Sequence, residues 1–156
     1  MDENDIVFIE NHSRVLDFIP KNENIYLTNI DHHHDVAYAK EDVESQCKKA
    51  NCSNWVKYIY DNYSLKEYIW IKNGNSTPIP DSLNHILTTQ YNLIDWNNEK
   101  RMLNIPDKLI LCLSEPWTPP KYRPLFFTWM DMYNEQFNTF CNIKLGEYQN
   151  EQKNCN

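Results

Sequence analysis

Glycine is scarce in this chain. Only Gly74 and Gly146 occur among 156 residues. The phosphate-binding loops of nucleotide- and dinucleotide-binding proteins need several closely spaced glycines, because backbone amides must approach the phosphates without a side chain in the way. Both kinds of loop are missing from the sequence, so nucleotide binding by either route is not expected.

Long apolar runs and an excess of positive charge are missing as well. No stretch approaches the length that spans a bilayer, and residues 1–20 lack a basic start followed by a long apolar core. The net charge of -7 argues against nucleic acid and anionic membranes as partners, and suits a small-molecule or peptide substrate with a cationic group. The five cysteines form no C-x-x-C pair, so we expect reduced thiols and a cytoplasmic protein, with the oligomeric state left open.

Aromatic residues, at 13% of the chain, are sufficient for a folded core. Apolar runs typical of strands occupy residues 6–9, 25–30, 68–71 and 108–113, and helix-forming segments occupy residues 14–18, 41–49, 53–63 and 124–140. This alternation predicts an α/β fold, a three-layer sandwich around a mainly parallel sheet. We expect a single metal-binding domain over residues 1–146 and a polar tail over 147–156.

Two of the helical segments have apolar faces, and the first of them should pack on the sheet. The first begins at Ser53 as N-cap, and the second opens at Pro124. Their predicted apolar residues are Trp55, Val56, Ile59, Tyr60 and Tyr63 in the first, and Leu125, Phe126, Trp129, Tyr133, Phe137 and Phe140 in the second. Residues 81–106 fit a helix followed by a strand or a loop return.

A histidine-rich run follows the second strand. The segment D-H-H-H-D, residues 31–35, supplies five metal-capable side chains in succession. If the chain stays extended there, Asp31, His33 and Asp35 share one face, while His32 and His34 share the other. Two carboxylates around an imidazole suit Mn²⁺, Fe²⁺ or Zn²⁺. The alternative is a polar loop whose histidines face solvent.

Polar segments follow every predicted strand, at residues 10–13, 31–35, 73–76 and 114–118. Ligands gather at the carboxyl ends of strands in parallel sheets. We therefore expect these four loops to converge on one rim, although polar residues are common in any loop.

These motifs resemble a known family. Residues 30–35 are similar to the D-A-H-x-D signature of ureohydrolases, the arginases and agmatinases, and residues 8–13 resemble the upstream G-G-D-H-S segment of that family. The combination of E-N-H-S-R, I-D-x-H-x-D, N-W-V-x-Y, Y-I-W-I-x-N-x-N-S and S-E-P-W-T-P-P is similar to a small arginase-related group that includes peptide arginases. The resemblance extends to about Arg123.

The resemblance implies a minimal arginase/deacetylase-like sandwich with one or two Mn²⁺ ions, Zn²⁺ and Fe²⁺ being alternatives. One ion would be held by His12, Asp31 and Asp35, and the other by Asp31, His33 and Glu115. The family also carries S-x-D-x-D-x-x-D-P. When its final proline is aligned on Pro119, Glu115 takes the position of the second aspartate and Leu113 that of the first.

The activity that the resemblance implies is hydrolysis of a guanidino group, on arginine in a peptide or on a small molecule, with release of urea. Candidate catalytic residues are Asp35, His85 and Glu10, with His32 and His34 as alternatives for proton transfer, and candidate substrate-binding residues are Asn73, Asn75 and Trp117. Two alternatives remain open, a deacetylase-type amide hydrolase and a non-catalytic metal- or ligand-binding protein on the same scaffold. Leu113 at a ligand position favours the second.

Overall fold

The computed structural model describes residues 6–98, 107–114 and 118–134. The chain forms two compact units, a larger one of Leu16–Met102 and a smaller one of Met1–Val15 with Leu103–Asn156. The boundary falls within the 3₁₀ helix η2 (His12–Phe18). The prediction of one domain over residues 1–146 stays a prediction, and the predicted tail 147–156 lies outside the described residues.

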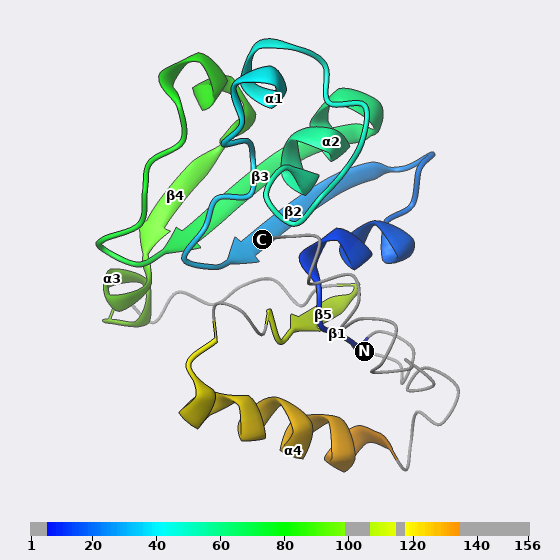
Figure 1. Cartoon of the computed structure of the whole chain (residues 1–156), viewed down its shortest axis with the longest axis vertical. Coiled ribbons are helices and arrows are strands. Elements are labelled where there is room, and N and C mark those ends of the chain that lie inside the picture. The colour runs from blue at the N-terminus through cyan, green and yellow to red at the C-terminus, as the bar shows by residue number, and fades with distance from the viewer. Residues whose placement is uncertain (1–5, 99–106, 115–117, 135–156) are drawn as a thin grey trace. The chain divides into compact units, whose positions relative to one another are not determined.

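The larger unit contains a parallel sheet of β2 (Asn24–Ile30), β3 (Ser64–Lys72) and β4 (Thr89–Asn92), in that spatial order (Figure 1). Ile30 lies opposite Ile71, and Lys72 lies opposite Asn92. The carboxyl ends of the three strands are therefore neighbours, which is where ligands collect in parallel sheets.

Helix α2 (Trp55–Asn62) packs against β3 and closes the core of this unit. Trp55, Val56 and Ile59 are buried, as the helical spacing predicted. Tyr60, predicted on the same face, is 38% exposed, so the apolar face is narrower than expected. The helix also begins after Asn54 and not after Ser53, one residue later than predicted.

Lys57, which was not predicted to be buried, is buried on α2, and nearby polar groups compensate its charge. The Lys57 ammonium lies 2.5 Å from an Asp61 carboxylate oxygen and donates to the Ser45 carbonyl at 2.7 Å. The Cys47 amide donates to the same Asp61 oxygen. A buried cation needs such partners, and a reading based on hydrophobicity alone does not reveal them.

The helix expected over residues 41–49 is confirmed only for α1 (Lys40–Glu44).

The described part of the ambiguous segment, residues 81–98, holds three short elements. The 3₁₀ helix η3 (Asp81–Ile86) leads into β4, and α3 (Leu93–Asn98) follows. Strand β4 reads T-Q-Y-N and its side chains are mostly half-buried. An edge strand with so few apolar residues gives no clear period-two signal.

The smaller unit pairs β1 (Ile6–Ile9) with β5 (Leu109–Cys112), again in parallel. The short η4 (Pro120–Tyr122) precedes α4 (Arg123–Asn134). Among the described residues of this unit, Phe8, Leu113 and Phe126 form one buried apolar cluster. Leu125, predicted on the apolar stripe of α4, is 50% exposed, so that prediction is wrong for this residue. Phe137 and Phe140 lie outside the described residues.

Helices with parallel strands confirm the α/β class. The described strands fall into two sheets, and every strand pair in them is parallel. The three-layer sandwich stays a prediction. Within the described ranges, no helix combines the length and the apolar character needed to cross a membrane.

Candidate metal centre

The loop of residues 31–35 starts on the last rung of the sheet. The Asp31 amide donates to the Ile71 carbonyl at 3.1 Å. The chain then bends over residues 31–33, and the Asp31 Oδ1 atom accepts the His33 amide at 3.1 Å. Asp35 adopts a left-handed φ of 52°, which aspartate tolerates better than most residues. The extended chain with alternating faces that the sequence suggested is therefore wrong, because side chains of the loop cap its own backbone.

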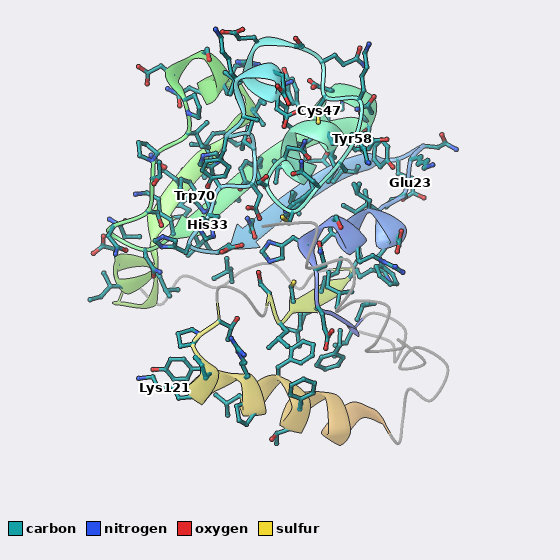
Figure 2. The ribbon with its side chains drawn as sticks, in the orientation of Figure 1. Glu23, His33, Cys47, Tyr58, Trp70 and Lys121 are labelled. Atoms are coloured by element: carbon teal, nitrogen blue, oxygen red, sulfur yellow. The ribbon has the colours of Figure 1, made fainter. Side chains whose placement is uncertain are left out.

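Aromatic side chains of β3 hold the loop by its carbonyl groups. The Trp70 indole N–H donates to the Asp31 carbonyl at 2.9 Å, and the Tyr68 hydroxyl donates to the His34 carbonyl at 2.7 Å. Both rings are fully buried. Figure 2 shows Trp70 and His33 near the arrowhead end of the sheet. The loop backbone is thus anchored to the core.

A third aromatic donor acts on a predicted ligand. The Trp55 indole N–H donates to Asp35 Oδ2 at 2.8 Å, and the Val56 amide donates to the Asp35 carbonyl at 3.0 Å. Asp35 is only 2% exposed. These bonds fix the orientation of the buried carboxylate from the first turn of α2. We call Trp55, Tyr68 and Trp70 the aromatic clamp.

Two carboxylates come together on this loop, and an imidazole lies beside one of them. A carboxylate oxygen of Asp31 and one of Asp35 lie within 4.8 Å of each other. The Asp31 Oδ1 atom lies 3.9 Å from His33 Nδ1. Adjacent negative charges with little exposure repel each other, and a cation between them relieves the repulsion. Oxygen and imidazole donors fit Mn²⁺, Fe²⁺ or Zn²⁺.

His34, in contrast, is built into the core as a neutral side chain. Its ring is fully buried, and Nδ1 accepts the Val36 amide at 3.0 Å. Desolvation lowers the pKa of His34 to about 4, against the opposing effect of Asp35. A neutral ring that accepts at Nδ1 carries its hydrogen on Nε2, so neither nitrogen offers a free lone pair. His34 is therefore not arranged as a ligand.

Tyr38 borders the same carboxylates. Its ring stacks on His34 with centroids 4.2 Å apart, and its hydroxyl oxygen accepts the His34 amide at 3.3 Å. Burial raises the pKa of Tyr38 to about 12, and the negative charges of Asp35 and Asp31 act in the same direction. The ring is still 42% exposed, so one part of it faces solvent.

The turn after β3 meets the histidine-rich loop. The Ser76 amide donates to the Asn73 carbonyl at 3.2 Å, closing the turn. His32 Nδ1 lies 3.4 Å from Asn73 Nδ2 and 3.3 Å from Ser76 Oγ. The convergence that the sequence predicted is thus confirmed for the loops 31–35 and 73–76, which follow neighbouring strands.

Two other candidates lie in the larger unit. His85 is exposed on η3, and its ring contacts Tyr60 with centroids 5.4 Å apart. Asn75 is exposed in the turn after β3. The catalytic role of His85 and the substrate-binding role of Asn75 stay predictions.

The remaining candidates belong to the smaller unit or lie outside the described residues. Glu10 is 3% exposed, and His12 opens η2. The roles predicted for both remain predictions. Glu115 and Trp117 lie outside the described residues. Leu113, at a position where the ureohydrolase pattern has an aspartate, is a buried core residue beside Phe8.

The aromatic clamp and Tyr38 are the residues that the sequence reading missed. Trp55 was predicted on the apolar face of a helix and Trp70 within an apolar strand. A buried indole N–H needs an acceptor, however, so both tryptophans imply a polar partner without indicating which one. The tryptophans in N-W-V-x-Y and Y-I-W-I were therefore the available signal.

Replacing Trp55 with phenylalanine should weaken Mn²⁺ binding about 10- to 100-fold, because Asp35 loses the donor that orients it. Calorimetric titration of Mn²⁺ into both proteins would measure this. Tyr60→Phe, on the exposed side of the same helix, is the matched control and should bind Mn²⁺ like the wild type. Equal affinity of Trp55→Phe and wild type would show that the indole does not orient a ligand.

Comparisons with known proteins give no match. No family profile, no curated protein and no solved structure is significantly similar to this chain. The chemistry of the 31–35 loop is thus the basis for a functional assignment.

Proposed function

We propose that this protein is a divalent-metal-dependent hydrolase of C–N bonds that cleaves a guanidino group and releases urea. The observation that carries the proposal is the carboxylate pair of Asp31 and Asp35, with His33 beside Asp31, at the carboxyl end of a parallel strand. The substrate would be an arginine side chain in a peptide or a small guanidino compound. Mn²⁺ is the proposed metal, with Zn²⁺ or Fe²⁺ as alternatives.

The spacing of the donors supports Asp31 as the shared ligand. It lies near His33 through Oδ1 and near Asp35 through a carboxylate oxygen, so Asp31 is the residue that would serve as a ligand together with either of the other two. His12 is proposed as a further ligand on the sequence motif alone. A divalent ion held by these residues would supply a nucleophile, because such ions lower the pKa of bound water toward neutrality.

The chain's own side chains suit a cationic substrate. Asp31 and Asp35 are assigned to the metal, so the attraction comes from the other acidic residues of the protein, which as a whole carries -7. A guanidinium group is planar and positively charged, so carboxylates attract it and orient it. His32 and Asn73 lie together at the border of the loop and are proposed to contact the substrate.

We further propose that the strands belong to a minimal arginase/deacetylase-like three-layer sandwich. Two observations on the larger unit support this. The sheet is parallel throughout, and the donor-bearing loop and the 73–76 turn both leave the carboxyl ends of adjacent strands.

A second candidate function is metal binding without catalysis. The observation that favours it is Leu113, which packs with Phe8 and Phe126 where the ureohydrolase pattern supplies a carboxylate ligand. A site lacking this ligand would hold fewer ions or hold them more weakly. Metal content separates the two functions, because two equivalents per chain would argue strongly against the non-catalytic one.

Purified protein should release urea when supplied with Mn²⁺ and a guanidino substrate. The assay would offer arginine, agmatine and arginine-containing peptides, with acetyl-lysine peptides and acetylated polyamines in parallel. Release should stop with a chelator and return when Mn²⁺ is added back. Metal-loaded protein that yields no urea from any substrate would sink the proposal, and acetate release instead would identify an amide hydrolase.

A further inference from the structure

Tyr38 has a hydroxyl group that the loop itself holds in place. The hydroxyl oxygen accepts the His34 amide at 3.3 Å, and the phenol ring stacks on the His34 ring at an interplanar angle of 15°. His34 is in turn fixed by the Val36 amide and by complete burial. Both the ring and the oxygen of Tyr38 are therefore positioned before any ligand arrives.

The hydrogen of this hydroxyl has no acceptor among the described residues. A phenol has one O–H, and its oxygen can accept while its hydrogen donates. In the part of the chain that the structure describes, Tyr38 makes no side-chain hydrogen bond as donor. Tyr38 as a residue is 42% exposed, so a ligand can approach its side chain.

The hydroxyl also lies beside the proposed ligands. It contacts the backbone of His34, the residue before Asp35, and its ring lies 6.4 Å from the His33 ring. Asp31 and Asp35 both act electrostatically on the phenol. Tyr38 is thus an exposed proton donor at the edge of the carboxylate pair.

We infer that the Tyr38 hydroxyl is a catalytic group that donates a hydrogen bond to a nitrogen of the guanidino substrate as water adds to its central carbon. The inference rests on the proposed function and deepens it. In the planar guanidinium ion the nitrogen lone pairs are delocalised, so they accept hydrogen bonds poorly. Addition of the water oxygen to carbon moves one electron pair onto nitrogen, which then becomes a good acceptor.

The chemistry balances without a further reactant. The C–O bond forms from water, the C–N bond to the leaving amine breaks, and the electron pair of that bond stays on nitrogen. The two protons of water pass to the products, so guanidinium and water give alkylammonium and urea. A donor that acts only after water has added stabilises the transition state more than the bound substrate, and therefore raises kcat more than it lowers KM.

The test compares Tyr38→Phe with the wild type. We expect kcat to fall about 100-fold while KM and Mn²⁺ affinity stay within about threefold, because the ring stack on His34 is kept and only one donor is removed. Borate provides a readout that does not depend on turnover. As a tetrahedral group with acceptor oxygens, it should bind Mn²⁺-loaded wild type about tenfold more tightly than the variant in calorimetry.

Tyr26→Phe is the control, since Tyr26 is an exposed tyrosine on β2, at 69%, and should leave every value unchanged. Unchanged kcat and borate affinity in Tyr38→Phe, with an active wild type, would overturn the role of Tyr38 alone. A wild type that binds Mn²⁺ but hydrolyses no guanidino substrate would overturn the proposed function and this inference with it. A parallel loss of Mn²⁺ affinity in Tyr38→Phe would show a structural role and also overturn the inference.

Discussion

Asp31→Asn should weaken Mn²⁺ binding about 100-fold or more and reduce urea release to background. Removing only a residue that supports a ligand typically costs 10- to 100-fold in metal affinity, so loss of a ligand shared by two ions should cost at least as much. The substitution removes the negative charge without disturbing the loop, because the asparagine oxygen can still accept the His33 amide and so keeps the bend. Calorimetry with Mn²⁺ and the urea assay measure the two effects.

His32→Asn is the matched control for Asp31→Asn. His32 is the next residue along the loop. Its Nδ1 atom lies near Asn73 and Ser76, and its ring packs edge-on against His33 with centroids 4.8 Å apart, but it is not one of the proposed ligands. Its replacement should change Mn²⁺ affinity by less than about threefold. Equal losses in the two variants would mean that the ligands have been assigned to the wrong side chains.

Acid should destabilise the metal-free protein through His34. The unfolded chain takes up this proton near pH 6.5, whereas the folded chain takes it up only near pH 4. Between these values the unfolded state binds more protons, so stability rises with pH. The contribution is complete above about pH 6.5 and is lost as the pH falls to about 4. It amounts to about 3 kcal/mol, which urea denaturation in the presence of a chelator would measure at several pH values.

His34→Asn separates this contribution from that of the other acid-titrating groups. Asparagine does not titrate, and its side-chain oxygen can accept the Val36 amide as Nδ1 does. The free energy of unfolding of the variant should therefore vary less steeply between pH 6.5 and pH 4. Parallel pH profiles for the two proteins would contradict the assignment of a buried neutral imidazole.

The sequence was sufficient to locate most strands. The apolar runs at residues 6–9 and 25–30 correspond to β1 and β2, and the run at 68–71 lies within the longer β3. Each is a short apolar stretch bounded by polar residues, which is the signal that a buried parallel strand leaves. The sequence left the segment of β4 open between a strand and a loop return, because its position depends on pairing with β3 and not on its own hydrophobicity.

The loop geometry could not be read from the sequence in the same way. The alternation rule placed Asp31, His33 and Asp35 together. The structure brings Asp35 and His33 each near Asp31, but it does not bring all three donors within 4.8 Å of one another. The arrangement differs because the chain bends and Asp35 is left-handed. The bend depends on side chains that hydrogen-bond to nearby backbone, which periodicity does not encode. The burial of His34 could not be predicted from the sequence either, because its ring is held by a hydrogen bond from the Val36 amide.

The strongest sequence signal that went unused was the pair of tryptophans at Trp55 and Trp70. Both were noticed within motifs, and both are buried. Their N–H groups reach Asp35 and Asp31 from elements that are 20 and 39 residues away in the chain. Such long-range partners follow from tertiary structure, and a single sequence gives no means of choosing among the available acceptors.

The aromatic clamp has a further consequence for how a ligand would meet this protein. Because Trp55, Tyr68 and Trp70 all belong to the packed core, the hydrogen bonds that they donate hold the loop in one conformation as part of the fold. The conformational entropy of residues 31–35 is lost when the polypeptide folds, so the free energy of metal binding does not have to offset this loss. The site would then select metal ions by their radius, because the positions of its ligand atoms would change little from one bound ion to another.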